Sequence, residues 1–95
     1  MQNAAVPTAE QFIAAVVGNG KDWSGITLSV VHGRKYNKIV SSHGGQRSAW
    51  AFMDQEGNIY KPASWKTPAK GVRFTAEQFA AAVERADRFG GFLYR

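Results

Sequence analysis

The stretch that decides the fold is Ser48-Ala49-Trp50-Ala51-Phe52-Met53-Asp54, followed by Gln55-Glu56-Gly57-Asn58 and Ile59-Tyr60-Lys61. Aromatic and apolar side chains predict a strand in the first segment, and the glycine-containing connection predicts a hairpin into the third. Successive side chains of a strand point to opposite faces of its sheet. The spacing therefore predicts one face with Trp50 and Phe52, and an opposite face with Ala49, Ala51 and Met53.

Two more strands are predicted before this hairpin. Apolar and polar residues alternate from Ile26 to Val30, which is the period of a strand. A second strand is expected from Lys35 to Ser42, and His43-Gly44-Gly45-Gln46 is expected to form a loop. After the hairpin, Pro62 should end the strand pairing because it lacks a backbone N–H. Residues Pro62 to Gly71 are expected to form an ordered, extended connection.

Helices are predicted at both ends of the chain. Thr8–Val16 is echoed by Thr75–Val83, and in each copy Thr is followed three residues later by Gln, the capping-box spacing. The first helix should run to about Val17. The second should extend to about Phe89 before Gly90-Gly91 and bury one face, made of Phe79, Ala82, Val83, Ala86 and Phe89. The predicted fold is α+β: an antiparallel sheet of three or four strands, with an N-terminal and a C-terminal helix on one face.

Composition limits the classes of protein to which the chain can belong. The 95 residues predict a single domain, 1–95, and contain no cysteine and only two histidines, so we expect neither disulfides nor a structural zinc site. No apolar run approaches the roughly 20 residues needed to cross a membrane. Met1 to Pro7 does not resemble a secretory signal, so we expect a cytoplasmic protein.

Positive charge is concentrated in the middle of the chain. From Arg34 to Arg73 there are eight basic residues and two acidic ones, Asp54 and Glu56, which gives +6 in a chain of net charge +5. The remaining residues carry four basic and five acidic side chains. Such asymmetry is typical of proteins with an anionic partner.

The segment from Lys61 to Lys70, KPASWKTPAK, interleaves three lysines with a tryptophan and two prolines. Lysines bind phosphates, and an exposed tryptophan offers a stacking surface for a base. Tyr36 is flanked by Lys35 and Lys38 in the same manner. The predicted ligand-binding residues are Lys35, Tyr36, Lys38, Arg47, Lys61, Trp65, Lys66 and Lys70. The alternative is that Trp65 only covers one end of the core while the lysines solvate the surface.

Two other constellations could carry chemistry. His32 and His43 could act as a general acid–base pair if the fold brought them together, but we expect them to be polar loop residues. Asp54 and Glu56 could hold Mg²⁺, but two carboxylates make a poor metal site and both are common in turns. We therefore expect no catalytic residue, no metal and no cofactor.

The segment Trp50-Ala51-Phe52-Met53-Asp54, with Gly57 to Lys70 after it, resembles a segment of small uncharacterised bacteriophage proteins. In that group an A-F-(I/M)-D strand leads through a glycine turn into K-P-A-S-W-K-x-P-A-K, and the ending Leu93-Tyr94-Arg95 is also similar. The resemblance covers about a third of the chain. It implies a phage origin and action in the cytoplasm of a bacterial host, and it transfers no site residue.

We therefore predict a non-enzymatic protein that binds nucleic acid or a phosphate-bearing nucleotide through its basic middle segment. Neither the choice among DNA, RNA and a small nucleotide nor that between a groove and a pocket follows from the sequence. The alternative is a protein–protein module, such as a phage inhibitor of a host protein or a small virion component. Self-association into a homo-oligomer fits that alternative as well.

Overall fold

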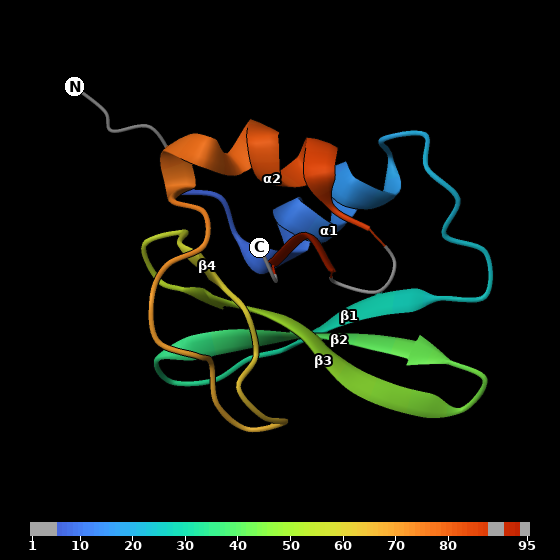
Figure 1. Cartoon of the computed structure of the whole chain (residues 1–95), viewed down its shortest axis with the longest axis horizontal. Helices are drawn as coiled ribbons and strands as arrows, with labels where there is room; N and C mark the ends of the chain where they lie inside the picture. Colours follow the sequence, from blue (N-terminus) through green and yellow to red (C-terminus); the bar gives the residue numbers. More distant parts are fainter. Residues whose placement is uncertain (1–5, 88–90, 94–95) are drawn as a thin grey trace.

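A four-stranded antiparallel sheet lies beneath a layer of helices (Figure 1). The computed structural model describes residues 6–87 and 91–93. The sheet contains, in chain order, β1 (Thr27–Val31), β2 (Tyr36–His43), β3 (Gln46–Asp54) and β4 (Ile59–Tyr60). The helical segments are α1 (Ala9–Val17), η1 (Ala76–Gln78), α2 (Phe79–Arg85) and η2 (Gly91–Leu93). Both α-helices cover the same face of the sheet, which confirms the predicted α+β class.

α1 and η1, which leads into α2, each begin at a predicted threonine, Thr8 and Thr75. The backbone N–H of Gln11 donates to Thr8 Oγ1 at 3.1 Å, and the N–H of Thr8 donates to Gln11 Oε1 at 2.9 Å. At the second start, the N–H of Thr75 donates to Gln78 Oε1 at 2.9 Å. These bonds satisfy amides that a helix start would otherwise leave unpaired. No described helix is long and apolar enough to cross a membrane.

The second helix ends earlier than its sequence predicts. Ala86 is extended, with φ −58° and ψ 139°, so α2 stops at Arg85; Phe89 lies outside the described residues. Lys21 Nζ donates to the carbonyl of Ala86 at 2.8 Å and also to that of Glu84. A cation that binds the last carbonyls stabilises a helix C-terminus. Because Lys21 comes from a distant segment, local periodicity could not reveal this end.

A β-bulge corrects the predicted faces of the third strand. Ile39 pairs with Ala51 and Val40 pairs with Ala49, so Trp50 is an extra residue without a direct partner on β2. An inserted residue shifts the alternation of the strand by one position. Trp50 consequently joins Ala51 and Met53 in the helix-side core, while Phe52 lies on the opposite face. The prediction that Trp50 and Phe52 share a face was therefore wrong.

Aromatic rings fill the space between the helices and the sheet. The ring centroid of Trp50 lies 5.9 Å from that of Phe12 on α1 and 5.2 Å from that of Phe92 on η2. Trp50 Nε1 donates to the carbonyl of Asp87 at 3.0 Å, which satisfies the polar edge of a buried indole. This core attaches the C-terminal segment to the sheet and leaves the opposite face of the sheet available for other contacts.

Candidate nucleic-acid interface

The sheet face that points away from the helices combines basic and apolar side chains. Lys38 on β2 pairs with Phe52 on β3, and Ser42 pairs with Arg47 farther along the same two strands. Val40 lies between these pairs on β2. Val40 and Phe52 are 0% and 3% exposed but do not belong to the helix-side core, so another part of the chain must cover them.

The connection after β4 supplies this cover by folding into a small hairpin. The N–H of Ala69 donates to the carbonyl of Lys61 at 2.8 Å, and the N–H of Ala63 donates to that of Thr67 at 3.0 Å. Pro62 and Pro68 face each other as an isolated β-bridge. The expectation of an extended connection was therefore wrong, because these cross-chain bonds close residues 61–69 into a hairpin. Its tip carries Trp65 and Lys66.

Trp65 lies over the outer sheet face between two cations. Lys38 Nζ is 3.7 Å from the centroid of the indole, and the guanidinium carbon of Arg47 is 5.6 Å from it. Both distances are within the range of cation–π contacts. Val40 lies between these two cations along the strands, which places the hairpin tip over this part of the outer face. Trp65 nevertheless remains 41% exposed, which leaves part of an aromatic surface open beside positive charge.

A second aromatic group lies at the end of the same face where β2 begins. The ring of Tyr36 meets that of Tyr60 edge to face at 5.4 Å and that of Phe52 at 6.5 Å. Lys35 Nζ is 5.7 Å from the centroid of Tyr36. A shallow hollow of about 270 Å³ opens here, lined by Lys35, Tyr36, Asp54, Gln55, Glu56 and Tyr60.

Asp54 organises the turn beside this hollow. Its carboxylate accepts hydrogen bonds from the N–H groups of Glu56 and Asn58, from Asn58 Nδ2 and from the hydroxyl of Tyr60 at 2.8 Å. Burial alone would raise the pKa of Asp54, but these hydrogen bonds outweigh it and hold the pKa below its ordinary value. The hydrogen bond to Asp54 raises the pKa of Tyr60 to about 12. This arrangement supports the turn interpretation of Asp54 rather than the Mg²⁺ interpretation.

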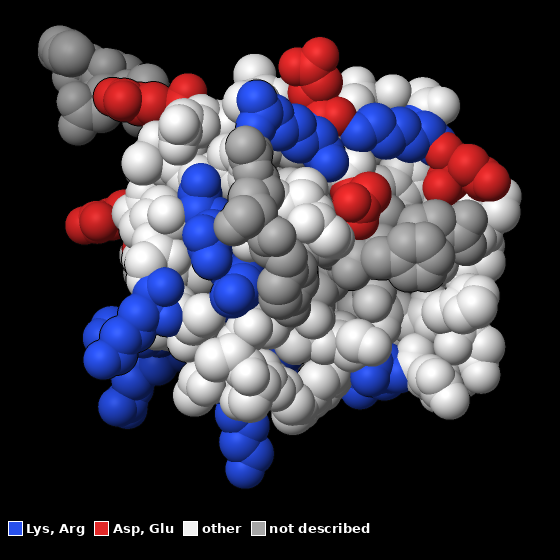
Figure 2. All heavy atoms as spheres, in the orientation of Figure 1, with Lys and Arg blue, Asp and Glu red and all other residues white. Residues whose placement is uncertain are grey.

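The structure brings some of the predicted binding residues together and leaves others apart. Lys38, Arg47 and Trp65 form one cluster, with Lys66 exposed beside Trp65 at the hairpin tip. Lys35 and Tyr36 form the neighbouring group. Lys61 is half-buried at the base of the hairpin, and Lys70 is exposed beyond it. In Figure 2 the lower, sheet side of the molecule shows basic and neutral side chains, whereas the visible acidic ones lie around the helical layer and at the left edge, beside the β3–β4 turn.

Sequence reasoning missed Tyr60 and Phe52 as parts of this face. Tyr60 pairs with Phe52 across β3 and β4, and Tyr36 pairs with Asp54 across β2 and β3. The β3–β4 hairpin was predicted, so its pairing could have placed Tyr60 beside Phe52. Uninterrupted alternation, however, ignores the bulge at Trp50 and so assigns Phe52 to the wrong face.

The two histidines lie at opposite ends of the β1–β2 hairpin. His32 follows the end of β1 and its Nε2 is 2.7 Å from Glu10 Oε2, whereas His43 ends β2 beside the start of β1. The five residues of β1 span about 17 Å, so the two imidazoles cannot act on one group. This separation excludes the acid–base pair considered from the sequence.

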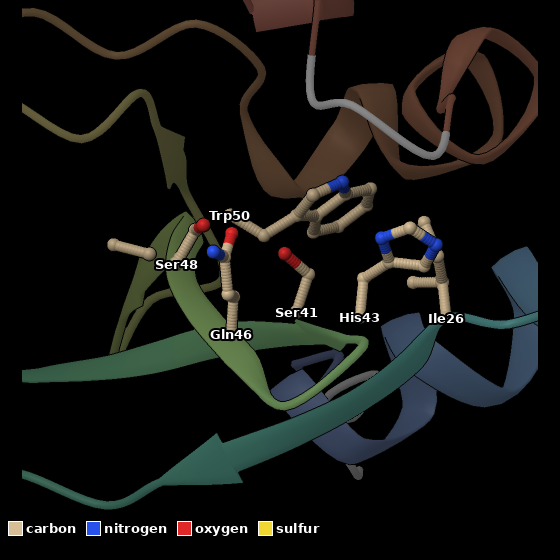
Figure 3. Close-up of a pocket in the computed structure, with 7 residues that line it drawn as sticks. Ile26, Ser41, His43, Gln46, Ser48 and Trp50 are labelled. Carbon is tan, nitrogen blue, oxygen red and sulfur yellow. The ribbon is translucent and has the colours of Figure 1, made fainter.

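His43 lines a small pocket on the helix side of the sheet (Figure 3). The pocket has a volume of about 210 Å³, and its polar lining consists of Ser41, His43, Gln46 and Ser48. Ser41 and Ser48 line the same pocket as His43, but within the described residues neither is hydrogen-bonded to it, so the pocket does not contain the hydrogen-bonded serine–histidine pair that is typical of an activated nucleophile. The lining contains no lysine or arginine, and it is separated from Trp65 by the sheet.

The fold and this face define a small α+β protein with a basic, aromatic surface on the sheet side opposite its helices. A family model matches residues 5–95, and the chain therefore belongs to a family of unknown function, DUF7717. No curated protein and no solved structure matches the chain.

Proposed function

We propose that this protein binds single-stranded nucleic acid on the outer sheet face, without catalysis. A base would stack on Trp65, and the adjoining phosphates would contact Arg47, Lys38 and Lys66. Trp65 is 41% exposed near the tip of the hairpin, which favours a strand that lies across the surface over an enclosed nucleotide. We place this activity in the cytoplasm, in a bacterial host if the chain is of phage origin.

The observation that carries the proposal is the position of Trp65. An indole that is 41% exposed and lies between Lys38 and Arg47 offers an aromatic surface and positive charge within a few ångströms of each other. Stacking of one base on an aromatic side chain contributes about 1–3 kcal/mol, and it tolerates any base. The two cations supply the electrostatic attraction to the backbone on either side of that base.

The number of cations around Trp65 predicts the salt dependence. Three phosphate contacts, from Lys38, Arg47 and Lys66, give a log–log slope of about −2 for a single strand. The slope should become less steep by about 0.7 for each cation replaced by methionine. The six cations among the residues predicted from the sequence would give a steeper slope, of about −4 to −5, if they all shared one surface.

The test is fluorescence anisotropy with labelled poly(dT) and poly(U). Trp65→Leu keeps an apolar side chain over Val40 and removes the aromatic surface, so binding should weaken roughly 5- to 150-fold, the equivalent of one stacked base. Trp65→Phe should retain most of the affinity. Trp23→Phe is the matched control, because Trp23 packs with the helix-side core. Equal affinity for wild type and Trp65→Leu, or a slope near zero, would contradict the proposal.

A further inference from the structure

The outer edge of β1 is open and uncharged. β1 is an edge strand, and within the described residues only β2 pairs with it. Its five residues, Thr27-Leu28-Ser29-Val30-Val31, contain no charge and no proline, and Val31 is 42% exposed. Edge strands of monomeric proteins are usually protected by lysine, proline or a bulge, because their free backbone groups can pair with another strand. This edge has none of these protections.

Helix α1 exposes an apolar stripe beside the same edge. Ala9, Phe12 and Val16 are buried, yet Ala14 and Val17 are exposed and Ile13 is half-buried, on another side of the helix. Val17 alone is 48% exposed. A hollow of about 330 Å³ separates the stripe from the strand, lined by Glu10, Ile13, Ala14, Leu28, Ser29 and Val30. A helix that is apolar on most sides is typically covered on more than one of them.

We propose that a second copy of this chain covers both features by pairing its β1 antiparallel to this one. Pairing about a two-fold axis at Ser29 uses all five residues, with Thr27 opposite Val31 and Leu28 opposite Val30. Residues directly opposite each other point to the same face, so the two α1 stripes meet above the joined sheet. In a chain of net charge +5, the paired strands themselves carry no charge, and the carboxylate on the stripe, Glu10, lies 2.7 Å from His32 Nε2 of its own chain.

The joined sheet has eight strands, four from each copy. Both Trp65 clusters then lie on the same side of the joined sheet, so one strand of nucleic acid can contact two copies. This consequence rests on the proposed function, whereas the pairing itself does not. The five residues of β1 and four residues of α1 (Glu10, Ile13, Ala14 and Val17) on each side correspond to roughly 600 Å² of buried surface in total, at the average area per interface residue. An area of this size predicts a weak dimer that depends on concentration.

A single introduced cysteine tests the pairing. The chain contains no native cysteine, so Ser29→Cys provides one thiol per copy. Residues on the two-fold axis have Cα atoms about 4.5–5.5 Å apart, within the range that a disulfide can bridge. Oxidation should convert Ser29→Cys to a covalent dimer at least tenfold faster than Ala80→Cys, which places the thiol at another exposed position, on α2. Equal rates for the two variants would overturn the proposal.

Sedimentation of the unmodified protein provides the second test. Wild type should shift from monomer to dimer as its concentration rises from about 10 µM to about 1 mM. Ala14→Glu places a second carboxylate beside Glu10 on the stripe and should keep the protein monomeric throughout this range. Its affinity per chain for a short poly(dT) should not change, because the new charge lies on the helix side, about a Debye length or more from Trp65. A monomeric wild type at the highest concentration would refute the dimer, whatever the oligonucleotide result.

Discussion

Lys38→Met tests whether the cation that faces Trp65 holds the indole in place. Methionine keeps the unbranched side chain and removes the charge. Lys38 Nζ lies 3.7 Å from the ring centroid, well inside the 6 Å limit of a cation–π contact. Trp65 is 41% exposed and Lys38 is half-buried, so a value between the exposed and desolvated limits applies, about 1 kcal/mol. In a domain of this size, that loss lowers Tm by roughly 4–8 °C.

A double-mutant cycle with Lys38→Met and Trp65→Leu separates this pair from its surroundings. Urea unfolding followed by far-ultraviolet circular dichroism gives the free energies of unfolding without relying on tryptophan fluorescence. The coupling energy should be about 1 kcal/mol. Lys35→Met is the control and should not couple to Trp65→Leu, because Lys35 lies over the ring of Tyr36. A Lys38–Trp65 coupling below about 0.3 kcal/mol, the usual error of additivity, would refute the geometry on which the stacking proposal depends.

Three further predictions concern the fold. Asp54→Asn should move the pKa of Tyr60 from about 12 back toward 10 in a spectrophotometric titration, because the carboxylate stabilises the protonated phenol. The same pair stabilises the wild type most between pH 3.8 and 10: the contribution of Asp54, whose pKa is lowered, is lost as pH falls below this range, and that of Tyr60, whose pKa is raised, is lost as pH rises toward 12. Identical pH dependence of urea unfolding in wild type and Asp54→Asn would contradict this account. Lys21→Met should reduce the free energy of unfolding by about 1 kcal/mol and speed amide hydrogen exchange in the last turn of α2, and unchanged protection there would refute its capping role. Gly57→Ala should lower the free energy of unfolding by about 2 kcal/mol or more, because φ is +84° and the new Cβ would lie 2.9 Å from a neighbouring side-chain carbon. Gly71→Ala is the control, because its φ is +93° but the space around it is open, and it should lower the free energy of unfolding by less. Equal losses for the two variants in urea unfolding would exclude the steric cause.

The fold class could be predicted because its signals are local. The two capping boxes each depend on residues three positions apart, and the β2–β3 hairpin depends on Gly44 and Gly45, whose φ values are +59° and +84°. A two-residue turn with positive φ at both positions is the geometry that suits a hairpin. Such features are encoded within a few residues, so a pass along the sequence can find them.

The faces of β3 could not be predicted because a bulge changes the period without an obvious local signal. Alternation alone puts Trp50 with Phe52, and no glycine marks the extra residue. Packing determines the outcome: the helix-side core takes Trp50, whose ring contacts Phe12 and Phe92 from segments far away in the sequence. The site could be predicted only in part, again because contacts between distant segments decide its arrangement. Residue types identified the cations and Trp65, but only the closed hairpin shows which cations reach the ring.

Trp65 on the covering hairpin could meet two separate requirements, covering the outer sheet face and binding a ligand. Val40 is fully buried on a face that no helix covers, so the fold requires an apolar side chain above it. Leucine at position 65 would meet that requirement, and it would leave less apolar surface in water. Cover therefore does not explain an indole that is 41% exposed, or its position between Lys38 and Arg47. The proposed ligand, which stacks on the ring and carries negative charge on both sides, would account for both features.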